Sequence, residues 1–207
     1  MKSIKRRKAF TLIELLIVIA IIGIMASLML PTISTAMKSV KKANSKNFMV
    51  QLAGAIDGYK AEYGYYPSFL TEKKRVNLAE GDNVNYLVMS LTGKELDGSP
   101  LKSTSDRNKY NRRMKPFFDF GDHLVKKGDK YQIVDSFGNP NIYICVDSGG
   151  VIKSGYPTVS DGISKDTYEE LAPQGRIRKS VIIFTLKKDS DKATGTEFYE
   201  AEDIFTW

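Results

Sequence analysis

The sequence predicts an α+β fold in which one long N-terminal helix packs on a small antiparallel β-sheet. Three observations lead to this prediction: a long apolar stretch near the start, a helical spacing of apolar residues after it, and strand-like segments in the second half. We expect four parts over the 207 residues. They are a short leader (1–9), an apolar helix (10–31), an amphipathic continuation of that helix (32–66) and a globular αβ region (67–207).

The composition excludes several classes of site. A single cysteine, Cys145, rules out an internal disulfide framework and a cysteine zinc cluster, and a single histidine, His123, rules out a multi-histidine metal centre. The net charge is +7, but five of the 31 basic residues lie in residues 1–9, where there is no acidic residue. Most of the excess charge therefore belongs to the leader, and we expect no nucleic-acid partner.

Residues 10–30 are strongly apolar. The run from Leu15 to Leu30 has 16 residues without a charge, and Glu14 is the one charge after Phe10. As a helix, residues 10–30 would be roughly 31 Å long, which matches a bilayer's hydrocarbon core. The alternatives are a buried core helix and a secretory signal peptide cut after Ser34-Thr35-Ala36. The stretch is longer than the roughly 7–15 apolar residues of a signal peptide. Its carboxylate also argues against one, because a charge in an apolar span costs about 2.5–3.5 kcal/mol and suggests a specific partner.

The start of the chain combines a basic leader, a small residue, Phe10-Thr-Leu-Ile-Glu14 and a long apolar helix. This pattern resembles the N-terminal signature of type IV pilins and type II secretion pseudopilins, and Pro31 lies where that family commonly has a proline. The resemblance implies that a prepilin peptidase cuts between Ala9 and Phe10 and that Phe10 is then N-methylated. The sequence departs from the family at Ala9, where glycine is the usual residue.

The same resemblance implies that Glu14 pairs with the N-terminal amine of a neighbouring subunit during assembly. An unpaired carboxylate in hydrocarbon is costly and pairing removes much of that cost, so Glu14 would set the register between subunits. The alternative is that Glu14 only reaches the nearby membrane interface. Basic residues precede and follow the span, but those of the leader are denser, which favours a cytoplasmic N-terminus.

The helix is predicted to continue beyond Pro31. Apolar or small residues recur there mostly in steps of three or four, which is an amphipathic helical period, and Gly64 and Pro67 are a stop signal. The tyrosine-rich stretch 59–67 is similar to the end of the long helix in major pseudopilins. The recurring residues are Ile33, Met37, Val40, Ala43, Phe48, Leu52, Ala55, Ile56 and Tyr59.

The globular region is expected to contain a further helix and three strands. We predict a helix near Val84–Leu91, then an exposed polar loop over 92–115, for which a nucleic-acid patch is the disfavoured alternative. His123 is expected at the surface. Segments 130–134 and 141–146 alternate like strands and would form a hairpin around the turn 135–140, with a third strand at 180–186 and Cys145 buried. The run 135–144 is similar to the Asp-Pro-Trp-Gly-Asn-Pro-Tyr motif of major pseudopilins.

The C-terminal segment resembles the calcium loop that ends major pseudopilins. The resemblance implies a site made of Asp189, Asp191, Asp203 and the carbonyl of Leu186, since calcium takes six to eight oxygen ligands. Lys187 and Lys188 depart from the family pattern and oppose a cation. The alternative is a solvated acidic loop held in place by Trp207.

The sequence shows no catalytic constellation, and we expect a structural subunit rather than an enzyme. The resemblance implies a pilin-like subunit of a type II secretion pseudopilus that drives export of folded proteins. It would lie in the inner membrane as a single-pass protein with a periplasmic C-terminal domain. Its implied partners are further copies of itself, the prepilin peptidase, other pseudopilins and the inner-membrane secretion platform. Alternatives are a type IV pilus subunit for adhesion or motility, and a membrane-anchored periplasmic domain with an uncut anchor.

Overall fold

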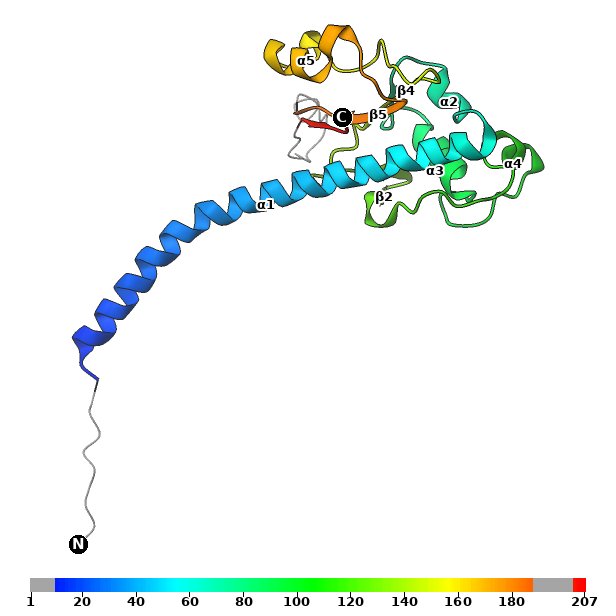
Figure 1. Cartoon of the computed structure of the whole chain (residues 1–207). Helices are drawn as coiled ribbons and strands as arrows, with labels where there is room; N and C mark the ends of the chain where they lie inside the picture. Colours follow the sequence, from blue (N-terminus) through cyan, green and yellow to red (C-terminus); the bar gives the residue numbers. More distant parts are fainter. Residues whose placement is uncertain (1–9, 188–202) are drawn as a thin grey trace. The chain divides into compact units, whose positions relative to one another are not determined.

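The computed structural model describes residues 10–187 and 203–207, with the backbone alone for residues 28–32. The chain divides into two compact units, Met1–Val40 and Lys41–Trp207. Helix α1 (Leu12–Tyr63) contributes to both units, and its helical assignment continues through Pro31 (Figure 1). No helix among the residues described is long and apolar enough to cross a membrane.

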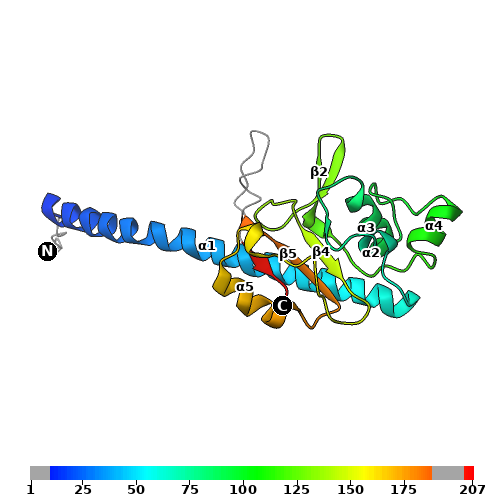
Figure 2. The ribbon, with the colours of Figure 1, turned by 90° about the horizontal axis from the view of Figure 1, so that it is seen from above.

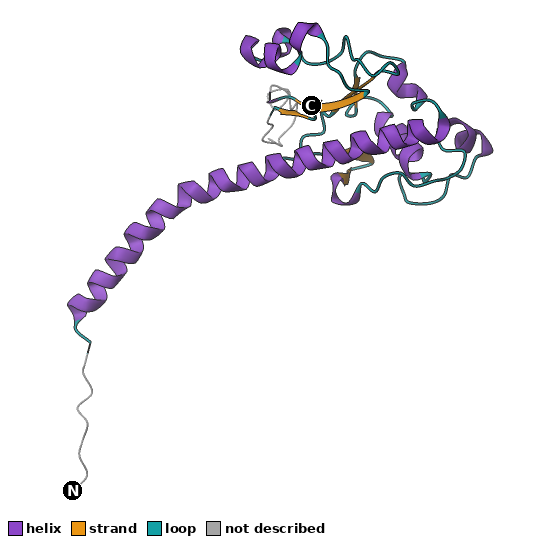
Figure 3. Cartoon of the chain, in the orientation of Figure 1, coloured by secondary structure: helices purple, strands orange, loops and turns teal. Residues whose placement is uncertain are grey.

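The second unit contains the remaining elements, which Figure 3 separates into helices, strands and loops. The helices are α2 (Ser68–Thr71), α3 (Asn83–Thr92), α4 (Thr104–Tyr110) and α5 (Lys165–Leu171), with short 3₁₀ turns at Gly121–His123, Val159–Asp161 and Pro173–Gly175. The strands are β1 (Val76–Asn77), β2 (Leu124–Lys127), β3 (Lys130–Ile133), β4 (Tyr143–Val146), β5 (Val181–Thr185) and β6 (Ile204–Phe205). The predicted long helix on a small sheet is confirmed.

The main sheet has the order β1-β4-β5-β6 and is antiparallel throughout. Figure 2 shows it lying across the second half of α1. Successive side chains of a strand point to opposite faces. Accordingly, Val181 and Ile183 of β5 pack with the α1 core, whereas Ile182 and Phe184 pack on the far face. Both faces of β5 are therefore buried, which explains why its sequence, Val-Ile-Ile-Phe-Thr, is almost entirely apolar instead of alternating with polar residues.

The far face of the sheet has its own core. Residues between β4 and β5 cover it, together with α5, which lies on the side of the sheet away from α1 (Figure 1). Cys145 of β4 is buried in this second core, as expected, and burial raises the pKa of its thiol to about 12. The sequence prediction of one helix on one sheet face missed this layer. Its apolar residues are Ile152, Tyr156, Ile163, Ala172 and Ile177.

Within the second unit, one face of α1 is buried from Ser45 to Tyr59. Met49, Leu52 and Ile56 are fully buried, and each such side chain contributes about 1.5–3 kcal/mol through removal from water. Ile33, Met37 and Val40, which belong to the predicted amphipathic stretch, are 55–58% exposed and lie outside this buried face. The helix ends at Tyr63, where Gly64 has a φ of 84° and its N–H closes on the carbonyl of Lys60.

The predicted hairpin between 130–134 and 141–146 is wrong. Strand β3 pairs instead with β2, through a two-residue turn at Gly128 and Asp129, where Gly128 has a positive φ. Strand β4 lies between β1 and β5. The turn after β3 closes on itself, because Asp135 accepts hydrogen bonds from the N–H groups of Phe137 and Asn139, and this redirects the chain.

The segment 92–115 is not an exposed loop throughout, as the sequence suggested. It contains α4, whose N-cap is Ser103, and it buries Leu101, Tyr110 and Asn111. The sequence prediction missed these buried positions because most of the residues around them are polar. The predicted helix near Val84–Leu91 is confirmed as α3.

Candidate functional site

Helix α1 begins with a capping box. The side-chain oxygen of Thr11 accepts a bond from the N–H of Glu14 at 3.3 Å, and the Glu14 carboxylate accepts bonds from the N–H and hydroxyl of Thr11 at 2.8 and 2.7 Å. This reciprocal arrangement satisfies donors that a helix start leaves free. The spacing Thr-x-x-Glu was a readable signal for it, and the sequence interpretation of Glu14 overlooked it. Glu14 therefore has a local partner within its own chain.

The first unit exposes a continuous apolar helix surface. Every large apolar side chain from Phe10 to Met25 is between 47% and 87% exposed, on all sides of α1. Contiguous apolar surfaces of this extent mark a site that contacts a membrane or another protein. Ile33, Met37 and Val40 extend the exposed apolar surface along the same helix.

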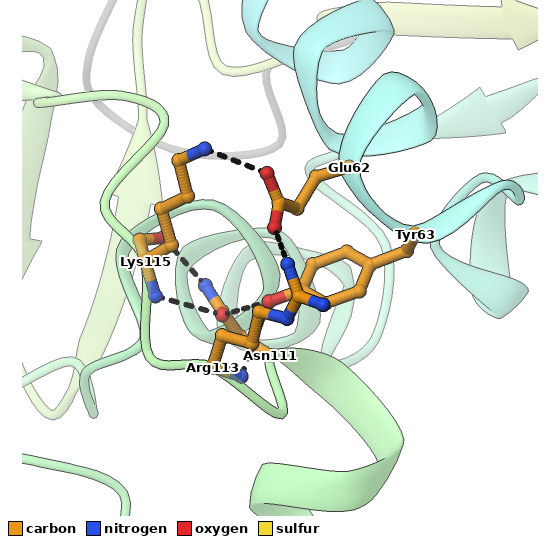
Figure 4. Close-up of polar contacts among 5 residues, drawn as sticks. All are labelled: Glu62, Tyr63, Asn111, Arg113 and Lys115. Carbon is orange, nitrogen blue, oxygen red and sulfur yellow. Dashed lines mark hydrogen bonds and ion pairs between the residues drawn. The ribbon is translucent and has the colours of Figure 1, made fainter.

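At its other end, α1 is held by a cluster of polar contacts with residues 111–115 (Figure 4). Asn111 is fully buried, and its side-chain oxygen accepts bonds from the Tyr63 hydroxyl at 2.7 Å and the Lys115 N–H at 3.0 Å. Its amide nitrogen donates to the carbonyls of Ser90 and Lys115. We call Glu62, Tyr63, Asn111, Arg113 and Lys115 the helix-end clasp.

Lys109, Arg113 and Lys115 of this region have partners within the chain. Glu62 pairs with Lys115 at 2.6 Å and with Arg113, and these hydrogen bonds, that of Lys115 foremost, hold the pKa of Glu62 below its usual value. Lys109 lies 5.0 Å from the ring centre of Tyr110 and 5.7 Å from that of Tyr86. These three basic residues therefore contact neighbouring side chains of the fold, although the sequence placed them in an exposed polar loop.

His123, expected at the surface, is half-buried. Its ring stacks on Phe48 of α1 at 3.8 Å, and Nδ1 lies 2.8 Å from the carbonyl oxygen of Val134. The residue therefore joins α1 to the turn after β3. No sequence signal pointed to this contact, because Phe48 and His123 are far apart in the chain.

Of the predicted calcium ligands, Leu186 and Asp203 are described, whereas Asp189 and Asp191 lie outside the described residues. Asp203 Oδ1 accepts a bond from the N–H of Lys187 at 2.7 Å, so this carboxylate joins the two ends of the intervening segment. Leu186 is buried in the second core. Within the described ranges, no three acidic, histidine or cysteine side chains could hold a metal ion, and the calcium site stays a prediction.

Trp207 anchors the C-terminal end of the described chain. Its indole N–H donates to the carbonyl of Leu171 at 2.7 Å, and its ring packs on Phe184 and Phe205. The acidic loop that Trp207 was expected to hold in place lies largely in residues 188–202, outside the described residues, so that interpretation stays a prediction.

Comparison with known proteins supports the resemblance to pseudopilins. Residues 4–30 match the prokaryotic N-terminal methylation motif. The chain is 34% identical over 68 residues to type II secretion system core protein G of Escherichia coli, a match covering 33% of this chain and 47% of that protein. It is 31% identical over 68 residues to core protein G of Vibrio cholerae, and this match also covers 33% of this chain and 47% of that protein.

A fimbrial protein is also similar. The chain is 34% identical over 87 residues to fimbrial protein EcpC of Eikenella corrodens, which covers 42% of this chain and 57% of that protein. The chain thus spans about half the length of the curated relatives it matches. No solved structure matches the chain.

Proposed function

We propose that this protein is a structural, non-enzymatic subunit of a type II secretion pseudopilus. The observation that carries the proposal is the apolar surface of α1, which is exposed from Phe10 onward. Glu14 is the one charged residue near its start, and both lie within the methylation motif. A helix with this surface needs apolar surroundings: the inner membrane before assembly and the helices of other copies afterwards. The second unit would then face the periplasm, and polymerisation would drive export of folded proteins.

In this proposal the Glu14 carboxylate serves both the helix cap and subunit pairing. The prepilin peptidase cuts between Ala9 and Phe10 and leaves an amine at Phe10, which is N-methylated. Glu14 of one copy pairs with that amine of the next copy, in a low-dielectric environment where an unpaired charge is costly. Breaking a buried ion pair by removing one partner costs about 3–5 kcal/mol, which is enough to stop assembly.

The capping box separates these two roles experimentally. Glu14→Gln keeps a capping-box residue but removes the charge, whereas Thr11→Val removes the hydroxyl of the cap, at about 1 kcal/mol, and leaves the charge. We expect Glu14→Gln to be inserted and processed normally and to yield few sheared filaments. Thr11→Val should assemble nearly as the unmodified chain does. Wild-type filament yield from Glu14→Gln would overturn the pairing role.

The second candidate is a type IV pilus subunit, favoured by the similarity to fimbrial protein EcpC. Both candidates share cleavage, methylation and assembly, so they differ in the consequence of losing the protein. Deleting the gene should abolish export of folded proteins for a pseudopilin, and adhesion or surface motility for a pilus subunit. Retained export together with lost motility would replace the first candidate by the second.

A further inference from the structure

A polar groove lies beside α1 in the second unit. It has a volume of about 530 Å³, and its lining is rich in carboxylates and side-chain amides. Four of its residues, Asn44, Asn47, Phe48 and Gln51, come from α1, and the others come from the segments before and after the β2–β3 hairpin. The acidic residues of the groove are Asp119, Asp122 and Asp135.

One carboxylate oxygen in this groove is buried without a partner. Asp135 is 3% exposed, and its Oδ1 accepts bonds from the N–H groups of Phe137 and Asn139, both at 2.8 Å. Its Oδ2 has no hydrogen-bond partner among the described residues. A buried acceptor left unsatisfied costs about 1–3 kcal/mol. Burial also raises the pKa of Asp135, which disfavours its charged form, so positive charge placed in the groove would stabilise this carboxylate. The exposed carboxylates Asp119 and Asp122 favour a cationic donor.

Helix α1 itself carries matching cations. Between Glu14 and Asp57 it contains four lysines and no acidic residue. Lys42 and Lys46 are exposed and four residues apart, so they share one flank of the helix. At about 100° per residue, that flank and the flank of Asn44, Asn47 and Gln51 lie on either side of the buried face. The helix geometry thus directs Lys42 and Lys46 away from the groove of their own chain.

The subunit register brings these two flanks to the same level. If Glu14 of one copy pairs with the Phe10 amine of the next, identical parallel helices are offset by four residues, or about 6 Å. Lys42 of the next copy is then level with residue 46 of the first copy, and its Lys46 is level with residue 50. Both positions fall within the span from Asn44 to Gln51 that borders the groove.

We propose that the groove bordered by Asn44, Asn47 and Gln51 receives Lys42 and Lys46 of the next copy of this chain. The exposed carboxylates of Asp119 and Asp122 are their acceptors, and the buried carboxylate of Asp135 adds negative charge behind them. The inference rests on the proposed filament and deepens it by assigning a second, periplasmic contact between the same two copies. The contact is heterologous, because one flank meets a different flank, and a heterologous contact that does not close into a ring generates a helical filament.

Cysteine cross-linking in the full-length, membrane-expressed chain tests the contact. The natural Cys145 is 1% exposed and its pKa is about 12, so it reacts little and gives a low background. The double variant Asp122→Cys with Lys46→Cys, treated with a short bismaleimide, should give a ladder of covalent multimers. The matched control, Asp129→Cys with Lys46→Cys, places the first cysteine on the exposed β2–β3 turn outside the groove and should give no ladder.

A charge swap supplies an independent readout. Lys46→Glu and Asp122→Lys should each lower filament yield several-fold, and the two together should restore part of it. Filaments that form normally while the groove pair gives no ladder, or a ladder equal to that of the control pair, would overturn the groove contact and leave the proposed function intact. Failure of the unmodified chain to form any filament would overturn both.

Discussion

Glu14 and Thr11 bond to each other at the start of α1, in the residues where processing is predicted to create a new N-terminus. The predicted cut between Ala9 and Phe10 would leave the capping box intact, because both of its residues follow that bond. A mature chain would therefore begin with a free amine directly before an already closed helix start. At the residue scale, the Glu14 carboxylate is held in a defined position before any neighbour arrives.

Cleavage is predicted between Ala9 and Phe10, because the basic leader and Phe-Thr-Leu-Ile-Glu surround that bond. Intact-mass analysis of membrane-extracted protein should show loss of residues 1–9 and the addition of one methyl group. Ala9→Gly should be processed at least as fast, since glycine is still smaller than alanine. A mature N-terminus near Met37 would instead support a secretory signal peptide, and an uncut chain would support a plain membrane anchor.

The helix-end clasp is the contact that fixes the end of α1 against α3 at the scale of elements. Asn111→Ala removes a fully buried amide that bonds to Tyr63, Ser90 and Lys115, and it leaves the buried carbonyl of Ser90 without this donor. We expect a loss of about 2–4 kcal/mol in the free energy of unfolding. Urea denaturation of a fragment that begins near residue 34 measures it.

Glu62→Gln is the control for this loss. The ion pairs of Glu62 with Arg113 and Lys115 are at the surface, so Glu62→Gln should lower the free energy of unfolding by less than Asn111→Ala does. Because the folded-state pKa of Glu62 is lowered, its contribution is present at neutral pH and is lost as the pH falls below 4.5 through that lower value. The stability difference between Glu62→Gln and the unmodified fragment should therefore shrink in acid. An equal loss from both variants would contradict the central role of Asn111.

Calcium is predicted to stabilise the C-terminal loop, if Asp189, Asp191 and Asp203 act as its ligands. A ligand that binds only the folded state adds about 2.7 kcal/mol at a hundred times its Kd, which raises Tm by several degrees. Asp203→Asn keeps the oxygen that accepts from the Lys187 N–H but removes a charge. It should therefore reduce the rise in Tm caused by calcium and leave the Tm without calcium nearly unchanged. Magnesium should not replace calcium, because it requires a tighter octahedral shell. Identical melting curves in millimolar calcium and in chelator would leave only a solvated acidic loop.

For the whole molecule, the two compact units differ in what they do with apolar side chains. The second unit buries them in two cores on either side of one sheet, whereas the first exposes them along α1. A globular unit that buries its own apolar surface is stable without partners, and a bare apolar helix is not. Polymerisation is therefore expected to depend on the first unit, with the groove beside α1 adding a contact between second units.

Local patterns in the sequence were sufficient for several elements. The apolar stretch, the helical period from Phe48 to Tyr59, and the segments of α3, β4 and β5 each carry their signal within about ten to twenty neighbouring residues. The N-terminal motif is likewise contiguous, which is why the resemblance and the similar proteins agree on it. Cleavage, methylation and subunit pairing remain predictions that rest on that motif.

Only the tertiary structure decided which strands pair and which polar residues meet. By its local pattern, strand β3 could pair with either β2 or β4. It pairs with β2 because the tight turn at Gly128 joins those two strands, and β4 already has β1 and β5 on its two edges. The contacts of Asn111 with Tyr63 and of His123 with Phe48 join residues that are far apart in the chain. Hydropathy and periodicity describe a segment's own faces, whereas these contacts depend on which distant segment covers each face.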